Sequence, residues 1–444
     1  MPDAPHPERD REFQQMRTAA REIFKQALAQ STIAQAFARN LEYSRGTLRI
    51  CEDLYLLESY ESVSVVSIGK GAHSMVDALA AHVTGKMSGI VAGTTEASSQ
   101  VHGFRYFKGG HPLPTAESLV AGRAILRYLR NQPESGLVIF LISGGGSAAV
   151  EFPVEGLDLA DIVETYRVLV HSGAPIAEMN AIRKHLSAIK GGRLARAAAP
   201  AQQVSIMISD VPDGELDSLS SGPTIPDSST VEDCHRIAAK HGMIENFPPS
   251  VRELFEKKLL EETPKHDDSA FVRSRWWPVL SNATVLQAAA AQAAAHDFAV
   301  EVDNRCDDWD YARAADYLLD RVRQLQRGDS KACVISGGEV TVKMTNEAGA
   351  GGRNQQFALY CARKIAGENI AVLSAGTDGI DGNSDAAGAV VDGSTVDRAR
   401  AAGLDPADAL CRFDADPFFK QIGDAIVTGP TGNNLRDLRV LIAW

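Results

Sequence analysis

The spacing of apolar positions changes near Ser62. Before it, Arg11–Ala29 is rich in Arg, Glu, Gln and Ala, and Ala34–Leu57 carries apolar residues near helical spacing, so we predict a helix over each range. After it, short β-branched runs alternate with stretches of helical spacing, which indicates a parallel sheet covered on both faces by helices. The predicted strands are Val63–Ile68, Gly89–Ala92, Leu137–Ile142 and Val204–Ile208, and the predicted helices are Ala72–Val83, Ala116–Leu129 and Leu159–Val170.

A charged stretch, Leu259–Ala270, interrupts this rhythm and predicts a boundary between two domains, residues 1–262 and 270–444. The second half again alternates strands and helices, so we predict a second α/β domain, with a hairpin that turns at Ser336–Glu339. Its predicted strands are Trp276–Leu280, Ala299–Val302, Ala332–Ile335, Val340–Met344 and Ile370–Ser374, and its predicted helices are Ala283–Ala295, Tyr311–Gln326 and Asn354–Ile365.

Composition excludes several classes of protein. The chain has 444 residues, and 45 Lys and Arg against 57 Asp and Glu give a net charge of −12, which argues against a nucleic-acid or anionic-membrane partner. No apolar run approaches the roughly 20 residues that cross a bilayer, and the first residues form no apolar leader, so we expect a cytoplasmic protein. Six cysteines without a C-x-x-C pair argue against a zinc site or a disulfide framework.

Glycine-rich polar loops follow four of the predicted strands. Ligands of open α/β sheets bind outside the carboxyl ends of the strands, so these loops are the expected place of a binding site. Glycines there allow backbone N–H groups to approach phosphate oxygens, although tight turns alone also favour glycine. The four loops are Gly69–Gly71, Ser143–Ser147, Ser209–Gly214 and Gly376–Gly382.

Lys70 stands between Gly69 and Gly71 at a strand-to-helix junction. A cation beside the positive end of a helix is unfavourable unless an anion binds both, so we interpret Lys70 as an anion-binding residue, with a surface lysine as the alternative. The Gly-x-Gly pattern starts a dinucleotide fingerprint, but Ser74 replaces its third glycine, and G-x-x-x-x-G-K-[ST] occurs nowhere in the chain. The sequence therefore favours neither a nicotinamide site nor a P-loop.

Two basic segments stand out in this acidic chain. Within Asn180–Leu194, Arg183 and Lys190 are seven residues apart and share one face if the segment is helical. Further along the chain, Arg353 and Asn354 follow a run of glycines and stand at the start of a predicted helix. The planar guanidinium of Arg353 suits bidentate contacts with phosphate or carboxylate. A solvated basic face and an unliganded loop are the respective alternatives.

Acidic residues lie in the same loops. One or two carboxylates hold Mg²⁺ in many phosphate sites while phosphate supplies further oxygens, although acids also serve simply as turn residues. His111 lies in a proline-rich turn before a helix, where it either touches substrate or stabilises the turn. The acids in question are Asp210, Asp213, Glu215, Asp378, Asp381 and Asp385.

Eight stretches together resemble the type II glycerate kinase family, the glycerate 2-kinases with a carboxyl-terminal MOFRL domain. They occur in the family's order over most of the chain: GGHPLPTAES, LISGGGSA, NAIRKHLSAIKGGRLA, SDVPDGELDSLSSGPT, SGGEVTV, GGRNQQFAL, GTDGIDGNSDAAGA and TGPTGNNLRDL. The resemblance implies a Rossmann-like amino-terminal domain with a parallel sheet, a MOFRL-type α/β domain with a mixed sheet, and an active site in the cleft between them. It also implies ATP- and Mg²⁺-dependent phosphorylation of D-glycerate to 2-phosphoglycerate.

The resemblance implies catalytic roles for Lys70, Asp210 and Arg353, and we interpret Asp213 and Asp378 as metal ligands. Two departures bear on acceptor specificity, because the family usually shows Gly-Asp where this chain has Asp213 and Gly214, and commonly shows alanine at Gly146. The expected substrate- and nucleotide-binding residues are Gly69, Gly71, His111, Ser143, Gly144, Gly145, Gly146, Ser147, Arg183, Lys190 and Asn354.

Three other readings remain open at this point. The first is a hydroxypyruvate reductase, a label given to members of this family, which would need a nicotinamide cofactor. The second is a kinase for a related small sugar acid. The third is a catalytically silent module that binds a sugar phosphate. The expected partners are ATP and a small acid, with no nucleic acid and no membrane, and a homodimer is left open.

Overall fold

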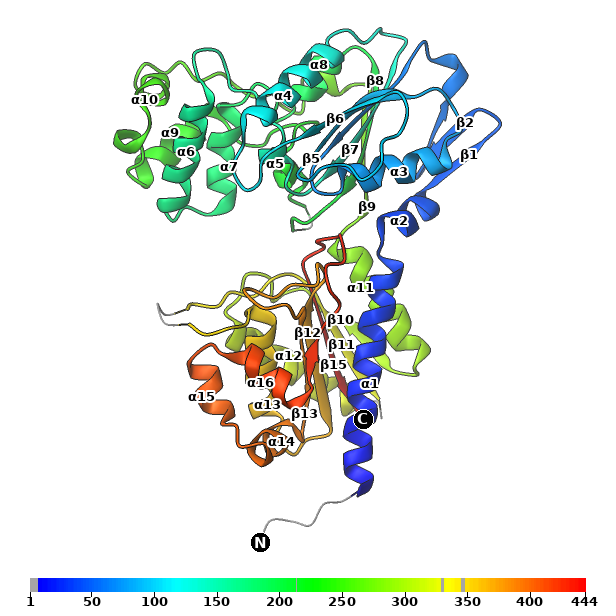
Figure 1. The fold of residues 1–444 in the computed structure, drawn as a ribbon, viewed down its shortest axis with the longest axis vertical. Helices are drawn as coiled ribbons and strands as arrows, with labels where there is room; N and C mark the ends of the chain where they lie inside the picture. Colours follow the sequence, from blue (N-terminus) through cyan, green and yellow to red (C-terminus); the bar gives the residue numbers. More distant parts are fainter. Residues whose placement is uncertain (1–6, 213, 329–330, 345–347) are drawn as a thin grey trace. The chain divides into compact units, whose positions relative to one another are not determined.

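The chain forms two compact units in the computed structural model, which describes residues 7–212, 214–328, 331–344 and 348–444. The middle unit runs from Ile33 to Val279, and the terminal unit combines the residues up to Thr32 with those from Leu280 onward (Figure 1). This division differs from the ranges 1–262 and 270–444 expected from the sequence, because helix α1 (Pro7–Gln30) packs on the sheet of the terminal unit. None of the described helices is both long and apolar enough to cross a membrane.

The sheet of the middle unit has six strands, in the order β6 (Phe104–Lys108), β5 (Ser88–Gly93), β4 (Val63–Ile68), β7 (Leu137–Ser143), β8 (Gln202–Ile208) and β9 (Ser274–Leu280). The pairings from β6 through β8 are parallel, and Ile68 of β4 lies opposite Ile142 of β7. Counted from β4, the order is third, second, first, fourth, fifth and sixth, which is that of a Rossmann-like fold. The predicted parallel sheet is confirmed, and its chain reversal falls between β4 and β7.

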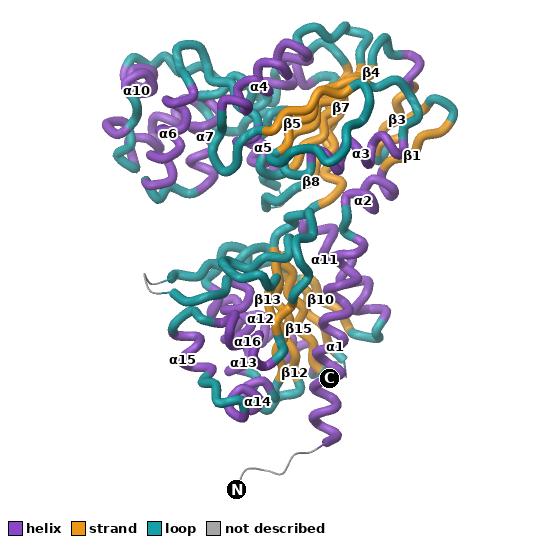
Figure 2. The backbone as a smooth tube through the Cα atoms, viewed as in Figure 1, coloured by secondary structure: helices purple, strands orange, loops and turns teal. Residues whose placement is uncertain are grey.

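Helices cover both faces of this sheet because its strands are apolar on both sides. Helices α4 (Ala116–Leu129) and α8 (Arg193–Ala198) share a core with Val66 and Phe140, whereas α3 (Ala72–His82) packs on the opposite face (Figure 2). A separate apolar core joins four helices at one end of the unit. These are α6 (Leu159–His171), α7 (Ile176–His185), α9 (Val231–Lys240) and α10 (Pro249–Glu256).

The helix predicted over Ala34–Leu57 is wrong beyond its first turns. Helix α2 (Ile33–Asn40) leads into a small antiparallel sheet of β1 (Leu41–Ser44), β2 (Thr47–Ile50) and β3 (Asp53–Leu56). Arg45 and Gly46 both have positive φ values, 50° and 79°, which makes the tight turn between β1 and β2. The spacing of apolar residues over this range resembles that of a helix, but the two-residue turn divides the range into short strands.

The sheet of the terminal unit is mixed, in the order β10 (Ala299–Val302), β11 (Ala332–Ser336), β15 (Asp437–Ala443), β12 (Ile370–Gly376), β13 (Gly388–Asp392) and β14 (Ala425–Ile426). Helices α1 and α11 (Asn282–Ala295) pack on one face, and α12 (Tyr311–Gln326) and α13 (Arg353–Lys364) pack on the other (Figure 1). The remaining helices are α5 (Gly146–Ala149) in the middle unit, and α14 (Thr395–Ala401), α15 (Pro406–Cys411) and α16 (Ala415–Ile422) beside α13.

The predicted hairpin at Ser336–Glu339 is wrong. Strand β11 pairs in parallel with β10 and antiparallel with β15, so both of its edges are already taken. The structure describes all of Val340–Met344, and this range contains no strand but only an isolated bridge between Thr341 and Asp310. The central partner, β15, comes from the last residues of the chain and was not predicted.

Candidate functional site

The loops after β4 and β7 are joined to each other at the point where the strand order of the middle unit reverses. The Lys70 amide donates a 2.8 Å hydrogen bond to the Gly144 carbonyl, and the Gly71 amide donates one of 2.9 Å to Ser143 Oγ. A Cβ at Gly69, whose φ is 114°, would lie 2.3 Å from the Ser143 carbonyl oxygen. Only glycine fits this approach, and a crevice at such a reversal is where open α/β sheets bind ligands.

The Lys70 side chain lies across Gly145. A Cβ at Gly145 would come within 2.9 Å of Lys70 Cγ and 3.3 Å of His111 Cδ2, so the three residues are in contact. No described carboxylate lies within ion-pair distance of the exposed Lys70 ammonium. Partial burial, together with the charge of Lys70, lowers the pKa of His111, so this histidine favours its neutral form. Within the described residues, the positive charge of Lys70 therefore has no carboxylate partner and is suited to an anionic ligand.

Ser220 holds the two ends of the Ser143–Gly146 turn together. Its hydroxyl donates 2.6 Å to the Ser143 carbonyl and accepts a 3.0 Å hydrogen bond from the Gly146 amide, and the Ser147 and Ser221 hydroxyls hydrogen-bond to each other. The amides of Gly144 and Gly145 make no hydrogen bond within the described residues. Ser220 therefore fixes the conformation of this turn, while two of the turn's N–H donors have no partner among the described residues and can bind a ligand.

Ser220 and Ser221 were not predicted to belong to the site. Both have left-handed backbones, with φ values of 50° and 60°, which costs on the order of 1–3 kcal/mol for each non-glycine residue. The stretch SLSSGPT carries them, but nothing in its composition shows that they reach the loop after β7.

Asp210 follows β8 and reaches the same loop. A Cβ at Gly144 would lie 1.9 Å from Asp210 Oδ2, so the carboxylate rests directly against the Gly144 backbone. The structure thus brings together Lys70, His111 and Asp210 around the glycine turn, as expected from the carboxyl ends of neighbouring strands. Asp213 lies outside the described residues.

Replacing Gly145 by alanine tests the contact with Lys70. We expect kcat/KM to fall about tenfold or more, because the new methyl group displaces the Lys70 side chain, alongside a loss of about 1 kcal/mol in stability from the left-handed backbone. Gly156→Ala is the matched control, since Gly156 has φ 88° but no atom within 4 Å of its Cβ position. Equal activity of both variants would contradict a functional role for this contact.

Arg183 and Lys190 do not share a helix face, so that expectation is wrong. Helix α7 ends at His185, before Lys190 is reached. The Lys190 side chain is buried and paired with the Glu151 carboxylate, which also accepts a 2.7 Å hydrogen bond from the Tyr166 hydroxyl. The Arg183 guanidinium lies 4.6 Å from the Tyr166 ring centre. Arg183 of α7 thus packs on Tyr166 of α6, and Lys190 is neutralised by a buried acid, so the role of both cations toward a ligand stays a prediction.

Arg353 opens α13 in the terminal unit and is held by two acids. Its Nε and one Nη donate 2.7 and 3.0 Å hydrogen bonds to the fully buried Asp437 carboxylate, and the same Nη lies 2.8 Å from Glu339 Oε1. Burial alone would lower the pKa of Arg353, but hydrogen bonds and charge from Asp437 raise it, while burial raises the pKa of Glu339. The second Nη makes no hydrogen bond within the described residues, so it is available to a ligand.

The start of α13 is capped by Asp381. The Asn354 and Gln355 amides donate hydrogen bonds of 3.0 and 2.8 Å to its two carboxylate oxygens. Asn354 itself is buried, and its side chain bonds Asp381 and Ser374. Because Asn354 is buried, its exposure does not support the expected contact with a ligand. Its hydrogen bonds instead hold the first turn of α13, which carries Arg353.

Asp381 should make stability depend on pH. Burial raises its pKa from 3.8 to about 7, so between these values the folded chain keeps a proton that the unfolded chain loses. The stabilisation is complete below pH about 4 and is lost as pH rises through about 7. Relative to Asp381→Asn, we expect the unfolding free energy of the unaltered chain to fall by about 2–3 kcal/mol between pH 5 and pH 8.

Urea unfolding at both pH values measures this change. Asp397→Asn, at a carboxyl group whose side chain is 81% exposed, serves as the control and should show no such difference. A difference between the unaltered chain and Asp381→Asn that is constant with pH would contradict the prediction.

A pocket of about 880 Å³ adjoins Arg353 in the terminal unit. Glu339, Asp378 and Asp381 line it beside the guanidinium. Asp378 Oδ1 accepts a hydrogen bond from the Ile380 amide, and Oδ2 makes none within the described residues. The described residues contain no cluster of three His, Cys, Asp or Glu side chains able to hold a metal alone. Asp378 nevertheless suits Mg²⁺, which takes one or two carboxylates together with phosphate oxygens.

Two family models match parts of the chain that lie in different units. Residues 19–256 match a domain of unknown function, DUF4147, and residues 332–437 match the MOFRL family. A D-glycerate 2-kinase of Thermotoga maritima is 35% identical over 85% of this chain and 90% of its own length. The chain belongs to the glycerate 2-kinase family. The crystal structure of a Thermotoga maritima glycerate kinase aligns with a TM-score of 0.84 at 32% identity, covering 97% of this chain and 100% of that one.

Not every relative in the glycerate 2-kinase family carries the same name. A protein of Agrobacterium vitis that is 37% identical, over 85% of this chain and 86% of its own length, is called a putative hydroxypyruvate reductase. The family and the two-domain α/β fold expected from the sequence motifs are confirmed, and the reductase activity remains the alternative that experiment must exclude.

Proposed function

We propose that this chain transfers the γ-phosphoryl group of ATP to the 2-hydroxyl group of D-glycerate. The observation that carries the proposal is the Lys70 side chain, which lies across a glycine turn at the reversal of a Rossmann-like sheet and has no carboxylate partner among the described residues. Membership of the glycerate 2-kinase family supports it. A glycerate carboxylate or a phosphoryl group is the anion that this arrangement suits.

Phosphoryl transfer asks a protein mainly to position reactants and to neutralise charge on the equatorial oxygens. We assign Lys70 and the free Nη of Arg353 to the substrate carboxylate and the transferred phosphoryl group. The Gly144 and Gly145 amides are the donors of the Ser143–Ser147 turn that remain for phosphate oxygens. Asp210 orients the acceptor hydroxyl and takes its proton as the hydroxyl oxygen bonds to phosphorus and ADP leaves.

Asp378 is the described residue that would hold Mg²⁺ in this proposal. When bound, the ion neutralises charge on the phosphate oxygens. The pairing of Arg353 with Asp437 and Glu339 keeps the guanidinium in one orientation, so its free edge faces a ligand without a change of rotamer.

The direct test incubates the purified full chain with ATP, Mg²⁺ and D-glycerate. We expect ADP release in equal amount to 2-phosphoglycerate, identified by phosphorus NMR. A panel of small hydroxy acids then defines which acceptor is preferred. Gly146 and the order Asp213, Gly214 are the sequence departures from the family that we expect to affect this preference. Oxidation of NADH or NADPH by hydroxypyruvate without ADP release would instead support the reductase and overturn the kinase proposal.

A further inference from the structure

The pocket beside Arg353 is larger and more apolar than a three-carbon acid requires. Its volume of about 880 Å³ is in the range of sites that enclose drug-sized ligands, which is roughly 300–1,000 Å³. Its lining includes the polar side chains of Arg353 and Asp378. It also includes five apolar residues, which we term the apolar wall: Val340, Val342, Ile380, Phe413 and Ala415. D-glycerate has hydroxyl and carboxylate groups over its whole surface and cannot use such a wall.

The apolar wall is held in place by the backbone around it. Phe413 has a φ of 54°, a left-handed conformation that is rare for a bulky residue and persists only where surrounding contacts enforce it. The next residue, Asp414, accepts a 2.9 Å hydrogen bond from the Ala350 amide, and Asn383 Oδ1 accepts one of 2.8 Å from Gly351. These bonds hold Ala350 and Gly351 of the glycine run in place beside Phe413.

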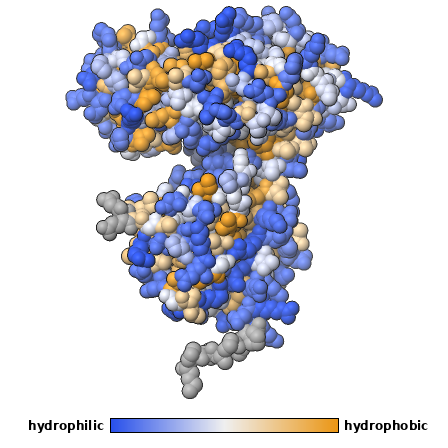
Figure 3. All heavy atoms as spheres, viewed as in Figure 1, coloured by the Kyte–Doolittle hydropathy of each residue, from blue (hydrophilic) through white to orange (hydrophobic). Residues whose placement is uncertain are grey.

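Part of this wall is open to solvent. Ile380 is 48% exposed although it is a large apolar residue in a pocket. Hydrophobic residues also reach the surface of the terminal unit on the face shown in Figure 3. An exposed apolar side chain beside a cation and a carboxylate suits a ligand with a flat apolar part and an anionic part.

We propose that this pocket binds the purine base and ribose of the nucleotide, with the phosphates directed toward Arg353 and Asp378. The inference rests on the proposed kinase function, since a nucleotide is the reactant that combines an apolar ring with a chain of phosphates. The base packs against Ile380 and Phe413, as flat aromatic rings do on aliphatic and aromatic side chains. The terminal unit is then the part of the chain that selects the nucleotide.

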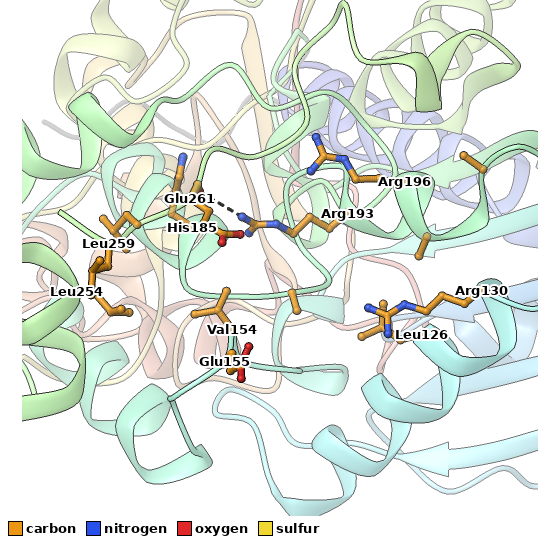
Figure 4. Close-up of a pocket in the computed structure, with 14 residues that line it drawn as sticks. Leu126, Arg130, Val154, Glu155, His185, Arg193, Arg196, Leu254, Leu259 and Glu261 are labelled. Carbon is orange, nitrogen blue, oxygen red and sulfur yellow. Dashed lines mark hydrogen bonds between the residues drawn. The ribbon is translucent and has the colours of Figure 1, made fainter. Parts of the chain in front are cut away.

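A second pocket, in the middle unit, serves as a comparison (Figure 4). Its volume is about 590 Å³, and Arg130, Arg193 and Arg196 line it. Arg193 donates hydrogen bonds to the carbonyls of Lys184, Ser187 and Glu261, and Arg196 pairs with Asp268. Two of its three cations therefore already hold segments of this unit together. Leu259, 54% exposed, supplies an apolar wall residue like Ile380.

Two matched variants, Ile380→Glu and Leu259→Glu, test the inference. Each places a carboxylate on a half-exposed apolar wall, the first in the pocket of the terminal unit and the second in that of the middle unit. Calorimetry with ADP and no glycerate should show at least about tenfold weaker binding for Ile380→Glu and a change below twofold for Leu259→Glu. In turnover, the KM for ATP should rise for Ile380→Glu while the KM for D-glycerate stays the same. Ile380→Ala, with about threefold weaker ADP binding expected, serves if the glutamate variant fails to fold.

Each outcome has a distinct meaning. ADP binding by Ile380→Glu and Ile380→Ala at the strength of the unaltered chain would overturn the inference, and so would a tenfold loss confined to Leu259→Glu. An unaltered chain that binds no ADP and releases none from ATP with D-glycerate would overturn the proposed kinase function itself. Binding of ADP without turnover of D-glycerate would leave the nucleotide pocket in place and change only the acceptor.

Discussion

Replacing Lys70 by alanine is expected to lower kcat/KM for D-glycerate phosphorylation by at least about 10², which corresponds to roughly 2.7 kcal/mol of transition-state stabilisation. The Lys70 side chain lies across Gly145, which His111 also contacts, and the described residues supply no carboxylate to neutralise the ammonium. Its charge is therefore available to an anionic reactant whose charge shifts during transfer. Steady-state kinetics with ATP and D-glycerate varied in turn measures the loss.

A control variant shows whether the loss of activity is specific to Lys70 or follows from removing any lysine of this unit. Lys108, in β6 of the same unit, is 56% exposed and pairs with an exposed Glu96, so Lys108→Ala should leave kcat/KM within twofold. The Lys70 variant should also raise the pKa of His111, because the nearby cation now lowers it, and histidine NMR detects this change without turnover. Unaltered kinetics together with the raised pKa would place Lys70 beside the site but outside the reaction.

The parts of the fold that were predicted from sequence are those whose signal is local. Val63–Ile68 and Leu137–Ile142 are continuous apolar runs because both faces of a parallel strand are buried, and the runs are followed directly by glycine-rich loops. Once these strands are placed in one parallel sheet, their carboxyl ends must share an edge. The meeting of Lys70, Ser143–Ser147 and Asp210 therefore followed from chain order and strand direction.

The parts that were missed depend on partners distant in sequence. Asp437 binds Arg353 from 84 residues away, and Glu151 pairs with Lys190 across 39 residues. The sequence does not distinguish a basic residue that contacts a ligand from one that pairs with a buried acid. Lys190 was therefore interpreted as a ligand contact. Strand β15 was missed because its antiparallel partners, β11 and β12, are set by tertiary packing at the end of the chain.

Replacing Arg353 by lysine is expected to lower kcat/KM by about 10², even though the positive charge is kept. The guanidinium uses Nε and one Nη for Asp437 and Glu339, and its other Nη has no partner among the described residues. A single ammonium cannot keep both acids bonded and also contact a ligand. Asp437 is fully buried, so an incompletely bonded carboxylate should also cost about 1–3 kcal/mol of stability. Kinetics and urea unfolding measure the two effects separately.

Arg400→Lys provides the comparison, because the Arg400 side chain in α14 is 70% exposed and its ion pair among the described residues is with the exposed Asp397, at 3.6 Å. Its stability should change by less than about 0.5 kcal/mol and its turnover not at all. Loss of stability in Arg353→Lys with full turnover would mean that the guanidinium fork serves only to hold β15 and α13 together. Loss of both, with the KM for ATP raised more than that for D-glycerate, would place the second Nη on the nucleotide phosphates, because Arg353 lines the pocket whose apolar wall suits a purine.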